Sequence, residues 1–248
     1  MLGKLIKHEF IYLIKDFTRT YIIYGAVVLI LKLLLSIAIH DNDPGTALTT
    51  LLIIFLIIYY IFTLILALLT ISHNSRRFKK NMFSHEGYLT NTLPVTPTQH
   101  IIAKVIVGAV NYILSFFVIF IGIEVLLSGI GIEKYLSRWL SEYLDYLDDI
   151  GILFPMFLQL ATGYLAFLLF CYLISSVSSM IGGSKGLAAL LAIGIIIAYI
   201  FIITVMSVQL EDSTESAKMY VFSLFHAILA AIEFGTVIYI IKNKLNLQ

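Results

Sequence analysis

Residues Ala47 to Ile71 read ALTTLLIIFLIIYYIFTLILALLTI, a stretch without a single charged side chain. A membrane-spanning α-helix needs about 20 mostly apolar residues, because its length must match the hydrocarbon core of the bilayer. The segment is therefore predicted to be a transmembrane helix. Five further runs of this kind, each long enough to span a bilayer, cover residues 20–39, 101–127, 152–177, 187–208 and 219–241.

The composition of the chain agrees with six spans. Of its 248 residues 60% are hydrophobic and only 12% are charged, whereas soluble domains carry about 25% charged residues. A soluble fold of this size cannot hide so much apolar surface. A net charge of +1 excludes a typical nucleic-acid-binding protein, and the single Cys171 excludes a disulfide framework. We expect an all-α polytopic membrane protein, with residues 1–248 forming one transmembrane domain.

The distribution of basic residues predicts the orientation of the spans. Cytoplasmic loops collect Lys and Arg. With both termini inside the cell, twelve of the 16 basic residues lie on the inner side, three lie outside, and Lys32 lies in the first span. Most acidic residues then lie outside. The sequence therefore predicts six transmembrane helices with an N-in and C-in topology.

Two segments flanking the spans are amphipathic. Residues 1–19 carry apolar side chains at three- and four-residue steps beside four basic residues, which predicts an elbow helix lying flat in the membrane interface. It is either a simple anchor or a contact for a cytoplasmic partner. The external segment 129–151 contains an apolar face within residues 132–150 and several acidic residues. It is interpreted as an interfacial helix, or alternatively as a lid whose acidic face attracts cations.

The longest cytoplasmic loop, residues 73–100, divides into two parts. Its basic run, residues 76–80, is explained by attraction to anionic lipid at the inner surface. The following residues, 84–93, mix apolar and polar side chains and come directly before Pro94. Because the residue before a proline disfavours helix, we predict a short amphipathic helix from Ser84 to Leu93.

Four ionisable residues inside the predicted spans are singled out here as candidates. Charge inside lipid is costly, and such residues are therefore candidates for function. Lys32 could pair with either of two glutamates as a structural ion pair, or the group could serve transport. One glutamate lies two helical turns from a histidine on the same face, which leaves a proton relay open. The four residues are Lys32, Glu124, Glu233 and His226.

The motifs of a phosphate-binding ATP loop and of a zinc protease are missing from the chain. It has no Gly-x-x-x-x-Gly-Lys-Ser/Thr loop for ATP. His8 and His85 each precede a glutamate, but the positions four residues after them are Tyr12 and Leu89 rather than histidine. The sequence predicts that the chain is not an enzyme and holds no metal or cofactor of its own.

The segment from Arg77 to Thr96, RFKKNMFSHEGYLTNTLPVT, resembles a family pattern: a basic aromatic run, then Glu-Gly-Tyr-Leu-Thr, then Leu-Pro-Val-Thr. The pattern is that of the permease (transmembrane) subunits of ABC-2-type ABC transporters, in particular those of Gram-positive bacteria. The resemblance extends to the whole architecture, with a basic N-terminal helix, six spans and a cytoplasmic loop after the second span.

The resemblance implies a location in the bacterial plasma membrane and a set of partners. A permease of this kind pairs with a second copy or a related permease and with two cytoplasmic ABC ATPase subunits, which hold the ATP and Mg. It mostly exports, and its cargo would be amphipathic or antimicrobial-type peptides. Residues 84–93 would form the coupling helix that contacts the ATPase, through Ser84, His85, Glu86, Gly87, Tyr88, Leu89 and Leu93.

Two other functional classes remain open from the sequence. One is a stand-alone, proton-coupled secondary transporter that uses Lys32, Glu124 and Glu233 and needs no ATPase. The other is a sensor or immunity protein that binds a peptide without moving it, through the external helix at residues 132–150. Neither explains the Glu-Gly-Tyr-Leu-Thr segment.

Overall fold

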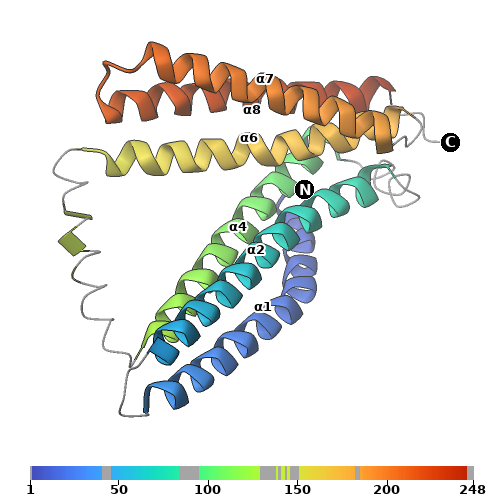
Figure 1. The fold of residues 1–248 in the computed structure, drawn as a ribbon. Coiled ribbons are helices and arrows are strands. Elements are labelled where there is room, and N and C mark those ends of the chain that lie inside the picture. Colours follow the sequence, from blue (N-terminus) through green and yellow to red (C-terminus); the bar gives the residue numbers. More distant parts are fainter. Residues whose placement is uncertain are drawn as a thin grey trace.

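The structure, a computed structural model, describes residues 2–40, 46–83, 95–128, 138, 141–142, 144–145, 151–181 and 185–244. This part of the chain is all α-helical and contains no strand. Figure 1 shows six long helices, which are α1 (Leu2–His40), α2 (Thr46–Phe83), α4 (Pro97–Leu127), α6 (Leu153–Met180), α7 (Lys185–Gln209) and α8 (Glu215–Lys244).

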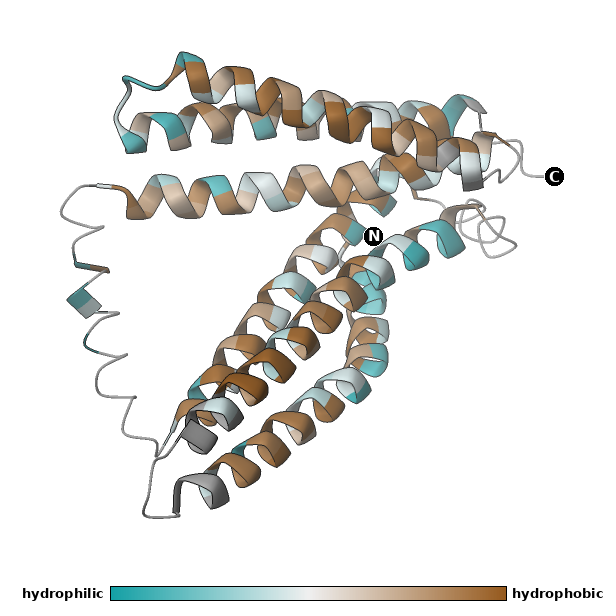
Figure 2. Cartoon of the chain, in the orientation of Figure 1, coloured by the Kyte–Doolittle hydropathy of each residue, from teal (hydrophilic) through white to brown (hydrophobic). Residues whose placement is uncertain are grey.

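All six helices are long and apolar enough to cross a membrane. The shortest, α7, has 25 residues, which corresponds to about 37 Å at a rise of 1.5 Å per residue. Figure 2 shows hydrophobic residues along the length of the helices and hydrophilic residues mainly toward their ends. The prediction of six transmembrane helices is thus confirmed at the level of length and composition, and the chain is a multi-pass membrane protein.

The N-terminal segment is helical, as predicted, but it is not a separate element. Residues from Leu2 onward belong to one continuous helix, α1, that runs to His40. Figure 1 shows that the first turns of α1 point in a different direction from the rest. No proline or glycine stands between Lys4 and Tyr24, so nothing in the backbone chemistry ends the helix where the apolar span begins.

The helices form two groups that meet at one end (Figure 1). Helices α1, α2 and α4 pack around a core that includes Tyr24, Tyr59 and Leu126. Helices α6 and α8 pack closely along their length, and α7 lies beside them. The two groups converge where α2 ends and α4 begins, which we call the basic end because Arg76 and Arg77 lie there. Toward the opposite end α4 and α6 diverge.

The main hydrophobic core joins the two groups at the basic end. Phe78 and Met82 of α2 are fully buried there, and so is Ile101 of α4. They pack with side chains of α6 and α8, among them Tyr172 and Val237. The last turns of α2 are therefore part of the packed interior, although they lie beyond the apolar stretch from which its span was predicted.

Candidate functional site

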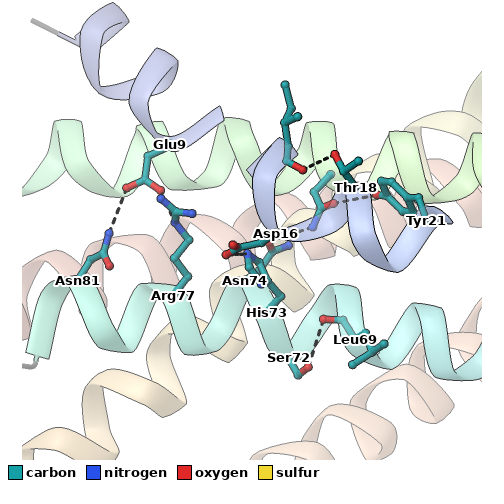
Figure 3. Close-up of polar contacts among 12 residues, drawn as sticks. Glu9, Asp16, Thr18, Tyr21, Leu69, Ser72, His73, Asn74, Arg77 and Asn81 are labelled. Atoms are coloured by element: carbon teal, nitrogen blue, oxygen red, sulfur yellow. Dashed lines mark hydrogen bonds and ion pairs between the residues drawn. The ribbon is translucent and has the colours of Figure 1, made fainter. Parts of the chain in front are cut away.

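A cluster of charged side chains lies inside the basic end. Glu9 of α1 accepts from Arg77 Nε of α2 at 2.7 Å and from Lys104 Nζ of α4 at 2.8 Å. Only 4% of the Lys104 side chain and 10% of the Glu9 side chain are exposed. Asn81 lies at the edge of this group, with its amide nitrogen 3.4 Å from Glu9 Oε1 (Figure 3). We call these four residues the Glu9 cluster.

Helix geometry explains why the Glu9 cluster forms here. Glu9 lies four residues before Leu13, and both are buried on the face of α1 that packs against α4. Arg77 precedes the buried Phe78. Its guanidinium lies 4.5 Å from the ring centroid of Tyr12, which follows Glu9 by three residues on α1. A buried carboxylate needs paired charges to compensate for lost hydration. One acid thus holds two bases that come from two different helices.

A row of uncharged polar side chains continues from this cluster between α1, α2 and α4. Asn111 Nδ2 donates to Asn74 Oδ1 at 3.3 Å, and Tyr21 Oη lies 3.1 Å from Asn111 Oδ1 and 2.9 Å from Ser115 Oγ. Ser115 in turn lies 3.0 Å from Thr70 Oγ1. We call this row the polar seam. Side-chain hydrogen bonds between helices hold them together in lipid, where apolar contacts give little specificity.

Helix α6 is attached to α4 through two tyrosines. Tyr164 Oη donates to the main-chain oxygen of Gly108 at 2.9 Å, and Tyr172 Oη donates to that of Lys104 at 3.4 Å. A Cβ atom on Gly108 would lie 2.9 Å from a methyl carbon of Leu168, so a larger residue at position 108 would force the Leu168 side chain to shift. Figure 1 shows α6 crossing the other group near this point. A small cavity beside Glu9 is lined in part by Gly108 and Tyr172.

The predicted coupling helix, residues 84–93, lies outside the described residues, but the helices that flank it are described. α2 continues to Phe83, whose ring packs edge-on against Phe78 with centroids 5.8 Å apart. α4 begins at Pro97, and Thr96 forms a capping box with Gln99, an arrangement that fixes a helix start. Both flanking helices are tied to Glu9, one through Arg77 and the other through Lys104.

The four intramembrane candidates do not form one site. Glu124 is exposed and Lys32 is half-buried, and no ion pair joins either of them to Glu233 in the part of the chain that the structure describes. Glu233 and His226 are both buried and share a face of α8, as their spacing predicted. His226 Nε2 lies 2.7 Å from Tyr199 Oη. Oε2 of Glu233 has no hydrogen-bond partner among the described residues.

The described residues bear on two further predictions, the absence of a metal site and the external helix. The described residues contain no group of three or more His, Cys, Asp and Glu side chains that could hold a metal. Of the external segment 132–150, five residues are described, and all are helical. The rest of that segment, and with it the choice between an interfacial helix and a lid, lies outside the described residues.

The Glu9 cluster and the polar seam are the features that sequence reasoning missed. Two signals were present. The predicted inner side carries twelve basic residues and only three acidic ones, of which Glu9 is one, so basic partners for Glu9 were available. Lys104 lies inside an apolar run, where a charge is costly. Comparison with known protein families, with curated proteins and with solved structures finds no match to the chain.

Proposed function

We propose that the chain is the transmembrane subunit of an ATP-driven ABC exporter, in which residues 84–93 dock onto a separate cytoplasmic ATPase subunit. The observation that carries the proposal is the way in which this segment is held. It connects α2 and α4, whose adjoining ends are both tied to Glu9 through buried ion pairs. A docking segment can transmit a displacement to the membrane helices only if α2 and α4, the helices on either side of it, move together.

The length of α2 adds support. The apolar stretch of this helix ends at Ile71, but the helix continues to Phe83. Twelve further residues correspond to about 18 Å of helix. The last described residue of this extension, Phe83, therefore lies well beyond the apolar stretch, and we expect the segment that follows it to be within reach of a water-soluble subunit. The positive-inside rule places the same end in the cytoplasm, where ATP is available.

A transporting dimer needs a free surface on each chain. No described residue in the apolar stretch of α7 is fully buried by the rest of the chain, so most of its side chains are left for lipid or for a second permease. The apolar core and the polar seam together fill the interior of the α1, α2 and α4 group. A cargo path would therefore lie on a surface shared between the two permease chains. Amphipathic peptides taken from the bilayer are the cargo that such an apolar surface favours.

The stand-alone transporter receives less support from the same structure. It requires Lys32, Glu124 and Glu233 to act together, and no ion pair joins them in the described chain. Its coupling charges would also have to be reachable by protons during the cycle, whereas Glu233 is buried.

The proposal is tested by substitution in the docking segment of the complete complex in membranes. Glu86→Arg should abolish peptide-stimulated ATP hydrolysis and export, because it reverses a charge at the centre of the docking surface. Lys79→Gln, an exposed change on α2 a few residues earlier, is the matched control and should leave both activities intact. Normal peptide export by the Glu86→Arg complex would refute the docking role. Stimulation by sugars or ions only would refute the peptide cargo.

A further inference from the structure

The contact between α4 and α6 is confined to the part of both helices near the basic end. There Tyr164 and Tyr172 bond to the main chain of α4, and the rings of Tyr112 and Tyr164 stack with centroids 4.0 Å apart. Tyr172 also stacks on Phe78 of α2 at 4.2 Å. Away from the basic end, α4 and α6 diverge (Figure 1). The packing of α4 against α6 is therefore close near the basic end, and the two helices separate toward their opposite ends.

Two apolar ridges extend from the stacked tyrosines toward the open end. Phe116 and Phe120 follow Tyr112 at four-residue steps, which is the spacing of a ridge along a helix. On α6, Leu160 and Phe157 precede Tyr164 by four and seven residues, so they lie on the face of Tyr164. Because Lys104 meets Tyr172 and Tyr112 meets Tyr164, the helices run antiparallel, and both ridges extend from the contact in the same direction.

The ridges are uncovered in the present structure. Phe116, Phe120, Leu160 and Phe157 are between 42 and 62% exposed. By contrast, side chains of the same helices at the contact, such as Leu168, are buried. The ridge residues thus continue an existing interface in register, but the helices are too far apart to complete it.

Each of the two helix groups that flank this opening is held together by its own side-chain contacts. The polar seam and the Glu9 cluster connect α4 to α1 and α2 through side-chain hydrogen bonds and ion pairs at several levels. On the other side, α6 packs along α8, with Ala166, Leu169 and Ala230 in a common core. A rotation between two such packed bodies occurs about their joint. Here the joint combines the core around Phe78 and Tyr172 with the close approach of Gly108 to Leu168.

We propose that the chain contains a hinge at Gly108 and Leu168, and that α4 and α6 close about it until the Phe116–Phe120 ridge packs against the Leu160–Phe157 ridge. The occupant of each exposed ridge is the facing ridge of the same chain. Closure would bury four large apolar side chains and extend the stacking that Tyr112 and Tyr164 begin. The hinge does not depend on ATP-driven export and can be tested on the isolated chain.

Paired cysteines in the purified chain, placed in lipid vesicles, test the hinge. The native cysteine is first replaced by Cys171→Ser, and a short bifunctional thiol reagent is then applied to double variants. Phe116→Cys with Leu160→Cys should cross-link within one chain with a yield several-fold above that of Phe117→Cys with Leu160→Cys. This second pair is the matched control, because Phe117 lies one residue further along α4 and about 100° around the helix.

Two measurements keep the test decisive. Tyr112→Cys with Tyr164→Cys reports on the joint and should cross-link readily. Equal yields for the ridge pair and its control, with the joint pair cross-linked, would overturn the hinge, and so would failure of the joint pair in a chain that remains monodisperse. Spin labels at residues 120 and 157 provide the independent readout. We expect two distance populations, whereas a single long distance would contradict closure.

Discussion

Replacing Glu9 by glutamine should destabilise the chain more than any comparable substitution of an acid near its basic end. The change preserves the shape of the side chain but removes the charge that Arg77 and Lys104 share. Lys104 then stays in a site where 4% of its side chain is exposed, facing a neutral amide in place of a carboxylate. Arg77 and Lys104 bind different oxygens of the Glu9 carboxylate. In glutamine one of these oxygens is replaced by an NH2 group, which cannot accept from the base that faces it.

The size of the effect follows from the burial of the cluster. Removing one partner of a buried ion pair costs about 3–5 kcal/mol. Because the remaining amide oxygen still accepts a hydrogen bond, we expect the lower part of this range, about 3 kcal/mol. For a chain of this length, that loss corresponds to a fall in Tm of roughly 6–12 °C. The measurement is thermal unfolding of the purified chain in one detergent, followed by circular dichroism or by intrinsic fluorescence.

Asp16→Asn is the matched control for this experiment. Asp16 lies two turns along the same helix, is about half exposed, and has its carboxylate 3.8 Å from His73 Nε2. Exposed ion pairs contribute about 0–1 kcal/mol, so its Tm should change by no more than about 4 °C. Equal shifts for the two variants, or no shift for Glu9→Gln, would refute the assignment of Glu9 as a buried link between helices.

Three further predictions concern the joint and the buried carboxyl. Gly108→Ala should cost about 1–3 kcal/mol by overpacking, and Leu168→Ala alone should cost about 2–5 kcal/mol because this side chain is buried. If the two residues clash, the double variant should lose less than the sum of the single losses; an additive loss would contradict the clash. Tyr172→Phe should cost less than about 1 kcal/mol, since its hydrogen bond is long, whereas Tyr172→Ala should cost about 3–5 kcal/mol by removing the stack on Phe78; equal Tm values would contradict this packing. Glu233→Met should leave Tm unchanged or higher, because it removes a buried oxygen without a partner in the described chain; a fall of several degrees would show that this oxygen is bonded.

The spans were predictable because lipid imposes a simple length rule. For α7 the apolar run 187–208 and the observed helix Lys185–Gln209 agree closely, since the length of this helix follows the apolar run. For α2 the same rule ended the span at Ile71, twelve residues too early for the helix. Hydropathy marks where hydrocarbon ends, whereas a helix ends at a breaker or a cap. Charged residues such as Arg76 continue a helix well.

The Glu9 cluster could not be predicted because its members are far apart in the chain. Glu9 and Arg77 are 68 residues apart, and Glu9 and Lys104 are 95 apart. No periodicity within one helix can pair them, and Glu9 and Arg77 each look like a solvated charge beside a span. Their meeting depends on the crossing of three helices. The candidates that the sequence favoured inside the spans, such as Lys32 and Glu124, were selected by cost of burial alone, which says nothing about partners.

The most direct test of the proposed exporter is its subunit composition. The tagged chain is purified from native membranes in mild detergent, and the proteins that accompany it are identified by mass spectrometry. We expect an ATP-binding subunit in about equal amount, together with a second permease if the pair is a heterodimer. Recovery of the chain alone, under conditions that keep a known ABC complex intact, would contradict the docking of residues 84–93 on an ATPase.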